Sequence, residues 1–191
     1  MKLKFLLVAG AAFGLVACGE TAEDTDLETQ TDVAAEQTDE SAMADPAMPT
    51  SAQEFATMQA ASDAYEIEAG GMAQENASDQ AVQEFGGMMV DDHTTSTENL
   101  RTALQQVEGV SVEPQMTAEQ QSNLDALRDA GEDFDRVYLE QQVAAHEKAL
   151  GMLRNYADNG DSEPLRQFAS QTADVVEGHL EQARQLHGQM Q

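Results

Sequence analysis

Four histidines are the residues of this chain whose chemistry stands out. Three of them, His93, His146 and His179, fall where helical periodicity otherwise places apolar residues, and His187 lies near the C-terminus, where we expect it to be solvated. Inward-facing imidazoles can bind a divalent transition metal. They can equally form a hydrogen-bonded polar cluster that fixes helix packing and titrates at about pH 6 to 7. The sequence leaves both interpretations open, because a single histidine at such a position is commonly a core residue.

Three carboxylates are candidate partners for these imidazoles. Asp92 adjoins His93, Glu66 flanks the apolar positions of the first expected helix, and Asp135 lies on the His146 face three turns away. Carboxylates of this kind bind a metal directly or hold its imidazole ligands by hydrogen bonds. The predicted site therefore holds one divalent transition metal. Its candidate residues are His93, His146, His179, Glu66, Asp92 and Asp135.

The histidine spacing argues against a di-iron centre. Di-iron bundles place a glutamate three residues before a histidine on two helices, so that both side chains face one pair of metals. Here the corresponding positions hold Val90, Val143, Val176 and Arg184. We therefore expect a protein without enzymatic activity, in which any metal site is mononuclear.

The elements that would position these residues are helices. Between residues 50 and 191 apolar residues recur at helical spacing, and no segment alternates as a strand would. Thr50 and Ser51 have capping-box spacing to Gln53 and Glu54, and a second such pair is found at residues 117 and 120. The expected helix breaks are at residues 76–79, 109–116, 131 and 159–162.

The apolar positions of the four long helices are the expected core. Helix by helix, they are Phe55, Met58, Tyr65, Ala69 and Met72; Val82, Phe85, Met89, Leu100, Leu104 and Val107; Leu139, Val143, Leu150, Leu153 and Ala157; and Leu165, Phe168, Val175, Ala183, Leu186 and Met190.

This pattern predicts an all-α domain, an antiparallel up-down four-helix bundle with a short extra helix at residues 117–129, before the long third helix. In an up-down bundle the first and third turns lie at the same end. At about 1.5 Å per residue, His93 would lie roughly 24 Å from the turn near Ser78. By the same rise, His146 and His179 would lie roughly 21 and 28 Å from the turn at Gly160. The three imidazoles would thus lie within about two helical turns of one level.

Several segments resemble the DUF4142 family. They are residues 65–68 (YEIE), 89–94 (MVDDHT), 134–138 (FDRVY), 144–148 (AAHEK) and 179–181 (HLE). The resemblance covers about residues 52–188. Members of this family are exported bacterial proteins of unassigned function with a ferritin-like four-helix fold. The resemblance therefore implies a ferritin-like bundle in the cell envelope, and it implies no established catalytic residues.

The N-terminus is typical of a bacterial lipoprotein precursor. Lys2 and Lys4 precede an apolar run, residues 5–16, that is too short to cross a bilayer as a helix. The run leads into LVAC at residues 15–18, which resembles a lipobox, and Cys18 is the only cysteine of the chain. We predict removal of residues 1–17 and membrane attachment through lipid on Cys18. Gly19, where aspartate would signal retention at the inner membrane, favours the outer membrane with the protein facing the periplasm.

The lipidated cysteine would be joined to the helical domain by an acidic tether. Residues 19–49 contain ten Asp or Glu, no Lys or Arg and no aromatic residue, so that we expect residues 18–49 to be disordered and residues 50–191 to fold. After removal of the signal peptide, seven basic residues remain against 36 acidic ones. Such a charge repels nucleic acid, which we exclude as a partner.

These features predict a membrane-anchored envelope lipoprotein whose helical domain has a non-enzymatic binding or stress-related function. The alternative is a metal-binding bundle that uses inward histidines from three helices. A third class, an oligomerising structural protein, would need an exposed apolar stripe, and the sequence offers little beyond the core faces. The sequence does not specify a protein partner.

Overall fold

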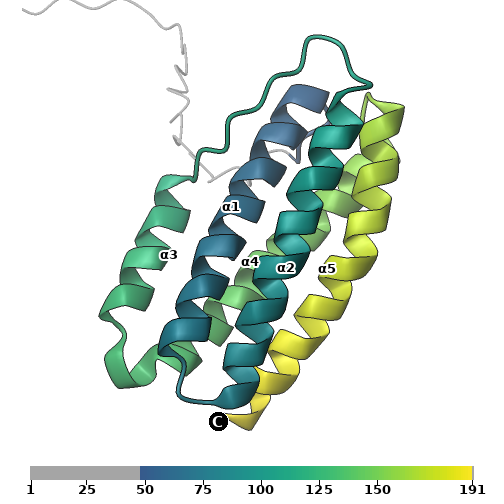
Figure 1. Ribbon diagram of the computed structural model, residues 1–191. Helices are drawn as coiled ribbons and strands as arrows, with labels where there is room; N and C mark the ends of the chain where they lie inside the picture. The colour runs from purple at the N-terminus through teal and green to yellow at the C-terminus, as the bar shows by residue number, and fades with distance from the viewer. Residues whose placement is uncertain (1–47, 191) are drawn as a thin grey trace, which may run out of the picture. The chain divides into compact units, whose positions relative to one another are not determined.

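The computed structural model describes residues 48–190, and the secondary structure within that range is helical, without a strand. Four long helices are present: α1 (Ala52–Asn76), α2 (Gln80–Leu104), α4 (Phe134–Asn159) and α5 (Glu163–Gln189). A shorter helix, α3 (Ala118–Asp129), and a single 3-10 turn, η1 (Gly131–Asp133), precede α4 (Figure 1). The predicted helical class and the short extra helix are confirmed. The predicted signal peptide, the predicted lipidation site Cys18 and most of the predicted tether lie outside the described residues.

Local capping explains where the helices begin. The Ser51 hydroxyl accepts a hydrogen bond from the Glu54 backbone N–H at 3.3 Å and donates one to the Glu54 carboxylate at 2.9 Å. Thr117 and Gln120 form a complete reciprocal capping box. Both satisfy backbone donors that the first helical turn leaves without partners. The two predicted helix starts are therefore confirmed.

The long helices form two hairpins that pack against each other. Helix α1 lies along α2 and α4 along α5, with α2 beside α5 and α1 beside α4 (Figure 1). The backbone N–H of Asp161, in the α4–α5 turn, donates to Thr50 at the start of α1. The backbone N–H of Ser78, in the α1–α2 turn, donates to Asp135 at the start of α4.

These contacts place the two turns at opposite ends of the domain, so the predicted placement at the same end is wrong. The connection between α2 and α4, residues 105–133, runs back along the domain and contains α3. Helix α3 packs on α1 and α4, where its Leu124 and Leu127 are buried. Burial of this apolar face offers a physical reason for the return path, because α3 would otherwise expose both leucines.

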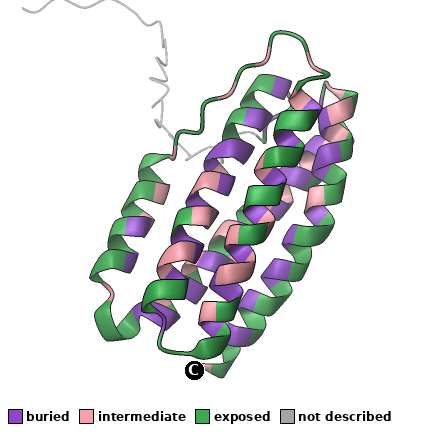
Figure 2. Cartoon of the chain, in the orientation of Figure 1, coloured by how far each residue is buried: buried purple, intermediate pink, exposed green. Residues whose placement is uncertain are grey.

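A layer of polar residues divides the buried core into two apolar clusters. One cluster lies toward the start of α1 and includes Phe55, Tyr156 and Phe168, and the other lies toward its end and includes Phe85 and Tyr138. The buried polar residues Gln59, Asp63, Glu66, His93, Ser96, Gln142, His146 and His179 occupy the helix positions between them. Buried residues follow the inner faces of the helices in Figure 2.

Two predicted core positions are wrong. Met58 is 39% exposed and Val175 is 47% exposed, and the valine of α5 that packs into the core is Val176. At Val175 the helical spacing fits either of two adjacent valines, and only packing decides between them. At Met58 the inward position belongs to its polar neighbour Gln59, which is 2% exposed and which a search for apolar residues passes over.

Helices α1 and α2 approach most closely at two glycines. A Cβ atom on Gly70 would lie 2.6 Å from the carbonyl oxygen of Gly86, and one on Gly86 would lie 2.7 Å from that of Gly70. Their neighbours Gly71 and Gly87 face no backbone of the partner helix. Gly70 and Gly86 therefore permit the close packing of α1 on α2. Within residues 48–190 no helix is long and apolar enough to cross a membrane.

Candidate metal centre

Three helices bring His93, His146 and His179 together in the polar layer. The ring centroids lie 5.5 to 5.8 Å apart, and each ring offers one nitrogen within 4.8 Å of a nitrogen of both others. All three residues are at most 4% exposed. The predicted convergence is correct although the turns were misplaced, because each histidine lies near the middle of a long helix and stays at mid-height whichever way that helix runs.

One nitrogen of each ring is held by an oxygen atom. Nδ1 of His93 lies 2.9 Å from the Asp63 carboxylate, and Nε2 of His179 lies 2.9 Å from that of Asp92. Nδ1 of His146 lies 2.9 Å from the backbone carbonyl of Gln142. A carbonyl oxygen only accepts, so Nδ1 of His146 carries the proton. When the rings are neutral, the nitrogen that contacts Asp63, Gln142 or Asp92, called the outer nitrogen below, carries the proton and donates a hydrogen bond. The other nitrogen of each ring then presents a lone pair.

The remaining nitrogens are buried and have no hydrogen-bond partner among the described residues. They are Nε2 of His93, Nε2 of His146 and Nδ1 of His179. An acceptor buried without a partner costs about 1–3 kcal/mol relative to its hydrated state. Three such atoms in one layer are a costly feature that a bound cation would relieve.

Helix α1 supplies the carboxylates behind the histidines. Asp63 accepts hydrogen bonds from Gln59 at 3.0 Å and from Ser96 at 3.0 Å, in addition to its contact with His93. Glu66 accepts from Gln142 at 2.7 Å and lies 3.9 Å from Nδ1 of His146. Asp63 and Glu66 are almost completely buried, so that their charges act on the site with little screening by water.

The three predicted carboxylates lie in two different parts of the structure. Glu66 and Asp92 lie beside the histidines, but the inclusion of Asp135 among the candidate site residues is wrong. Asp135 accepts from the backbone N–H groups of Ser78 and Asp79 and from the Ser78 hydroxyl, and so fixes the α1–α2 turn. At the first turn of α4, Asp135 is three helical turns from His146, a distance along the axis that no aspartate side chain spans.

Sequence reasoning missed Gln59, Asp63, Ser96 and Gln142. The available signal was an interruption of the apolar pattern. Between Phe55 and Tyr65 no large apolar side chain of α1 is buried, and polar residues occupy the inward positions. A similar interruption occurs on α2, at His93 and Ser96, and on α4, at Gln142 and His146. Polar residues at matched levels on several helices predict a shared buried layer.

Electrostatics differ among the three rings. Burial lowers the pKa of His146 to about 3, and the neighbouring His93 and His179 act in the same direction. Burial also lowers the pKa of His179, with Asp92 opposing the shift. Burial alone would lower the pKa of His93, but the hydrogen bond to Asp63 and the charge of Glu66 outweigh it and the pKa is raised. His146 and His179 are therefore neutral near pH 7 and suited to bind a metal.

Glu66 has the opposite response to burial. Loss of hydration raises its pKa to about 6, opposed by the charge of His93 and the hydrogen bond from Gln142. A cation nearby stabilises the charged form of such a buried carboxylate.

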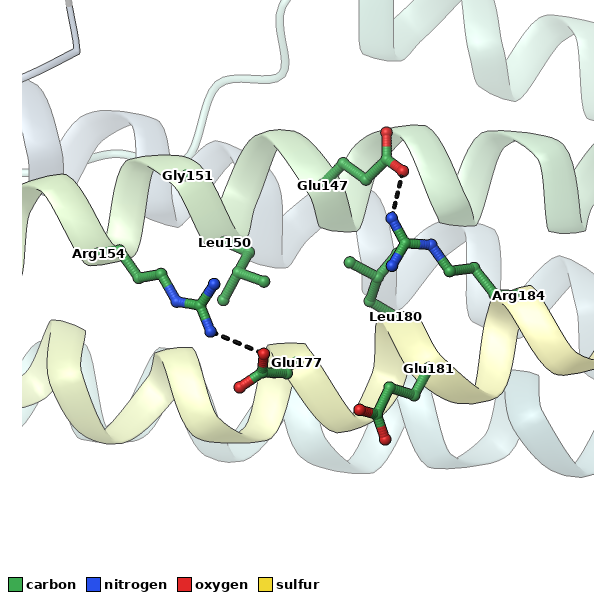
Figure 3. A pocket seen from close by; sticks show the side chains of 8 residues that line it. All are labelled: Glu147, Leu150, Gly151, Arg154, Glu177, Leu180, Glu181 and Arg184. Atoms are coloured by element: carbon green, nitrogen blue, oxygen red, sulfur yellow. Dashed lines mark hydrogen bonds and ion pairs between the residues drawn. The ribbon is translucent and has the colours of Figure 1, made fainter.

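Two grooves lie outside this polar layer. One, of about 200 Å³, lies between α1, the start of α3 and α4, and its lining includes Met58, Tyr65 and Lys148. The other, of about 370 Å³, lies between α4 and α5 (Figure 3). In the second groove the ion pairs Arg154–Glu177 (2.7 Å) and Arg184–Glu147 (2.6 Å) cross from one helix to the other beside Leu150 and Leu180. Neither groove is lined by one of the three histidines.

Comparison with known proteins identifies the family. No curated protein and no solved structure matches the chain. The family model described as "Domain of unknown function (DUF4142)" matches residues 37–186, which include all of the polar layer and most of the helical domain. The resemblance noted in the sequence is thereby confirmed, and the chain belongs to the DUF4142 family.

Proposed function

We propose that this protein binds one divalent transition-metal ion between His93, His146 and His179. Two observations carry the proposal: His93, His146 and His179, from three helices, each offer one ring nitrogen within 4.8 Å of the others, and each ring has one buried nitrogen without a partner among the described residues. The opposite nitrogen of each ring is held by Asp63, Gln142 or Asp92. Protein metal sites commonly fix ligand histidines in this way.

The donor set favours particular metals. Three imidazoles without a thiolate suit Zn²⁺, Cu²⁺, Ni²⁺ or Co²⁺, whereas Mg²⁺ and Ca²⁺ prefer oxygen ligands. The buried carboxylates Asp63 and Glu66 and the half-exposed Asp92 would offset the charge of a divalent ion. Three protein ligands leave room for water or a nearby carboxylate as a fourth ligand.

A buried polar cluster that only fixes helix packing is the competing interpretation. The hydrogen bonds of Ser96 with Asp63 and Gln59 support it, because they join α2 to α1. It leaves the three inward nitrogens without partners, however, at a cost in stability that a purely structural network would avoid.

Metal analysis of the purified protein tests the proposal. The protein, isolated in detergent without a histidine tag, is stripped with a chelator and titrated with Zn²⁺, Cu²⁺ or Co²⁺ while bound metal and melting temperature are measured. We expect one ion per chain, a rise in melting temperature, and with Co²⁺ the visible absorption bands of a nitrogen-rich site. No bound metal and no thermal shift would contradict the proposal.

We further propose that the domain is a ferritin-like antiparallel four-helix bundle, held at the outer membrane by lipid on Cys18 and facing the periplasm, with no enzymatic activity. The fold assignment is supported by two helical hairpins joined by a long connection. The anchor is supported by the LVAC motif before the acidic segment. The absence of any glutamate three residues before a histidine supports a role in binding or stress protection rather than in oxidation.

A further inference from the structure

We infer that the metal ion enters and leaves the site through the seam between α2 and α5, at the Asp92–His179 pair, and that Gly178 sets the rate. This inference rests on the proposed metal site and concerns its exchange with solvent. Among the groups hydrogen-bonded to the three rings, Asp92 is the one that reaches solvent: its side chain is 43% exposed, and that of Asp63 is 1% exposed.

The other sides of the site are closed. On the α1 side, Asp63 and Glu66 are buried and hydrogen-bonded to neighbouring helices. On the α4–α5 side, Leu150 and Leu180 are buried, and two ion pairs join the helices over them (Figure 3). An ion approaching between α2 and α5 meets the Asp92 carboxylate first and then His179, whose opposite nitrogen, Nδ1, is one of the three without a partner.

Gly178, which precedes His179, has no structural reason to be glycine. It lies in the interior of α5, is exposed, and a Cβ atom there would meet nothing within 4 Å. Its backbone φ is not positive. Glycine in a helix interior favours local opening, because it gains more backbone freedom than other residues when the helix opens. This interior glycine of α5 therefore adjoins the histidine whose carboxylate partner, Asp92, reaches solvent.

Local opening of α5 at Gly178 would release His179 from its position and admit the ion. Native proteins open locally in this way without unfolding globally. If loading and release both pass through the opened form, then reducing its population slows both by the same factor. The dissociation constant of the closed site is then unchanged.

Stopped-flow loading with Co²⁺ tests the route. Wild-type protein and Gly178→Ala are stripped of metal and mixed with Co²⁺, and release is followed after addition of EDTA. We expect Gly178→Ala to slow loading and release about fivefold, the factor equivalent to the ~1 kcal/mol difference in helix propensity between glycine and alanine. The Co²⁺ dissociation constant is expected to stay within twofold of the wild-type value.

Gly71→Ala is the matched control, because Gly71 lies in the interior of α1 and a Cβ atom there also meets nothing within 4 Å. It is expected to leave both rates unchanged. A second pair tests the charge at the seam: Asp92→Asn is expected to slow loading at least threefold more than Asp91→Asn, whose exposed carboxylate carries the same charge one residue away.

Equilibrium titration separates the two ways of failing. If the wild-type protein does not bind Co²⁺, the metal site and the route are both overturned. If it binds Co²⁺ and Gly178→Ala loads within twofold of the wild-type rate, or no more slowly than Gly71→Ala, the route alone is overturned.

Discussion

At the scale of single residues, the atom bonded to the outer nitrogen of each histidine determines what the ring can do. The Gln142 carbonyl can only accept a hydrogen bond, so it fixes the proton of His146 on Nδ1 and leaves Nε2 free. The carboxylates of Asp63 and Asp92 do the same for neutral His93 and His179. The three rings are therefore oriented for a ligand before one arrives, which lowers the entropic cost of binding.

His146→Leu separates stability from function. Leucine removes a buried imidazole with an unpaired nitrogen, so we expect the free energy of unfolding of the metal-free protein to rise by about 1–3 kcal/mol. The same substitution should abolish the thermal shift that metal produces. Urea denaturation with and without Zn²⁺ measures both, and His187→Gln, outside the site, is the control. A less stable metal-free variant would support the polar-cluster interpretation instead.

The pH dependence of the metal-free protein reports on the same ring. The pKa of His146 is about 3 in the folded protein, against an ordinary value of 6.5. Between pH 6.5 and 3 the imidazole is therefore protonated in the unfolded chain and neutral in the folded one. Stability contributed by the neutral ring is thus lost as the pH falls from 6.5 toward 3. Relative to His146→Leu, the free energy of unfolding should fall by ~1.4 kcal/mol per pH unit between about pH 6 and 4.

Ring proton NMR gives a direct check of this shift. The His146 resonances should not titrate between about pH 7 and 4. Titration of His146 near pH 6.5 would show that burial does not suppress its charge.

At the scale of helices, the fold depends on the height along each helix at which its inward residues are polar or apolar. Each long helix is apolar toward its ends and polar at mid-height, so the packed helices enclose one polar layer between two apolar clusters. The ends of the hairpins are fixed separately, by Asp135 at the α1–α2 turn and by the Asp161–Thr50 hydrogen bond at the other.

Close packing of α1 on α2 depends on Gly70. A Cβ atom there would meet the Gly86 carbonyl at 2.6 Å, so Gly70→Ala must push the helices apart and is expected to lower the free energy of unfolding by about 1–3 kcal/mol. Gly71→Ala adds a Cβ atom in open space and is expected to raise it by up to about 1 kcal/mol. Urea denaturation compares the two, and equal effects would contradict the close approach.

Substitution of Asp135 tests whether this residue serves the stability of the fold or the binding of metal. Asp135→Ala leaves two backbone donors and the Ser78 hydroxyl without their acceptor, so we expect a loss of about 1–3 kcal/mol in the free energy of unfolding. Asp133→Ala, an exposed neighbour, should have little effect. Zn²⁺ affinity, measured by calorimetry, should be unchanged in both. A large loss of affinity in Asp135→Ala alone would return this residue to the metal site.

At the scale of the whole molecule, the net charge and the proposed lipid attachment would define the setting of the site. The chain carries a formal net charge of −27, which disfavours anionic partners and attracts cations. Together with lipid on Cys18, this charge would place a cation-binding domain near the membrane surface.

Attachment through Cys18 can be measured in cells that export the protein. Two or three acyl chains bind a membrane stably, and the contact is apolar, so the wild-type protein should stay in the membrane fraction after washes with concentrated salt. Cys18→Ser should remove the lipid and either leave the chain soluble or retain it as an uncleaved precursor. Release of the wild-type protein by salt alone would contradict a lipid anchor.

The helical class, the capped starts at Ser51 and Thr117, the family and the three converging histidines could all be predicted from the sequence. So could the helix breaks, except that α2 ends at Leu104 and not near residue 109. These depend on local chemistry and on helical periodicity, which are written along the chain. Mid-helix histidines remain at one level in either topology, and so their convergence could be predicted even with the turns misplaced.

The direction of the hairpins, the path of α3 and the choice of carboxylates that hold the rings depend on how the helices pack together. Asp63 and Asp135 are alike in the sequence, yet one supports His93 and the other fixes a turn. The exposure of Met58 and Val175 likewise follows from how the helices pack and not from the apolar pattern. These features depend on contacts between residues far apart in the chain, and neither residue type nor spacing along a single helix encodes them.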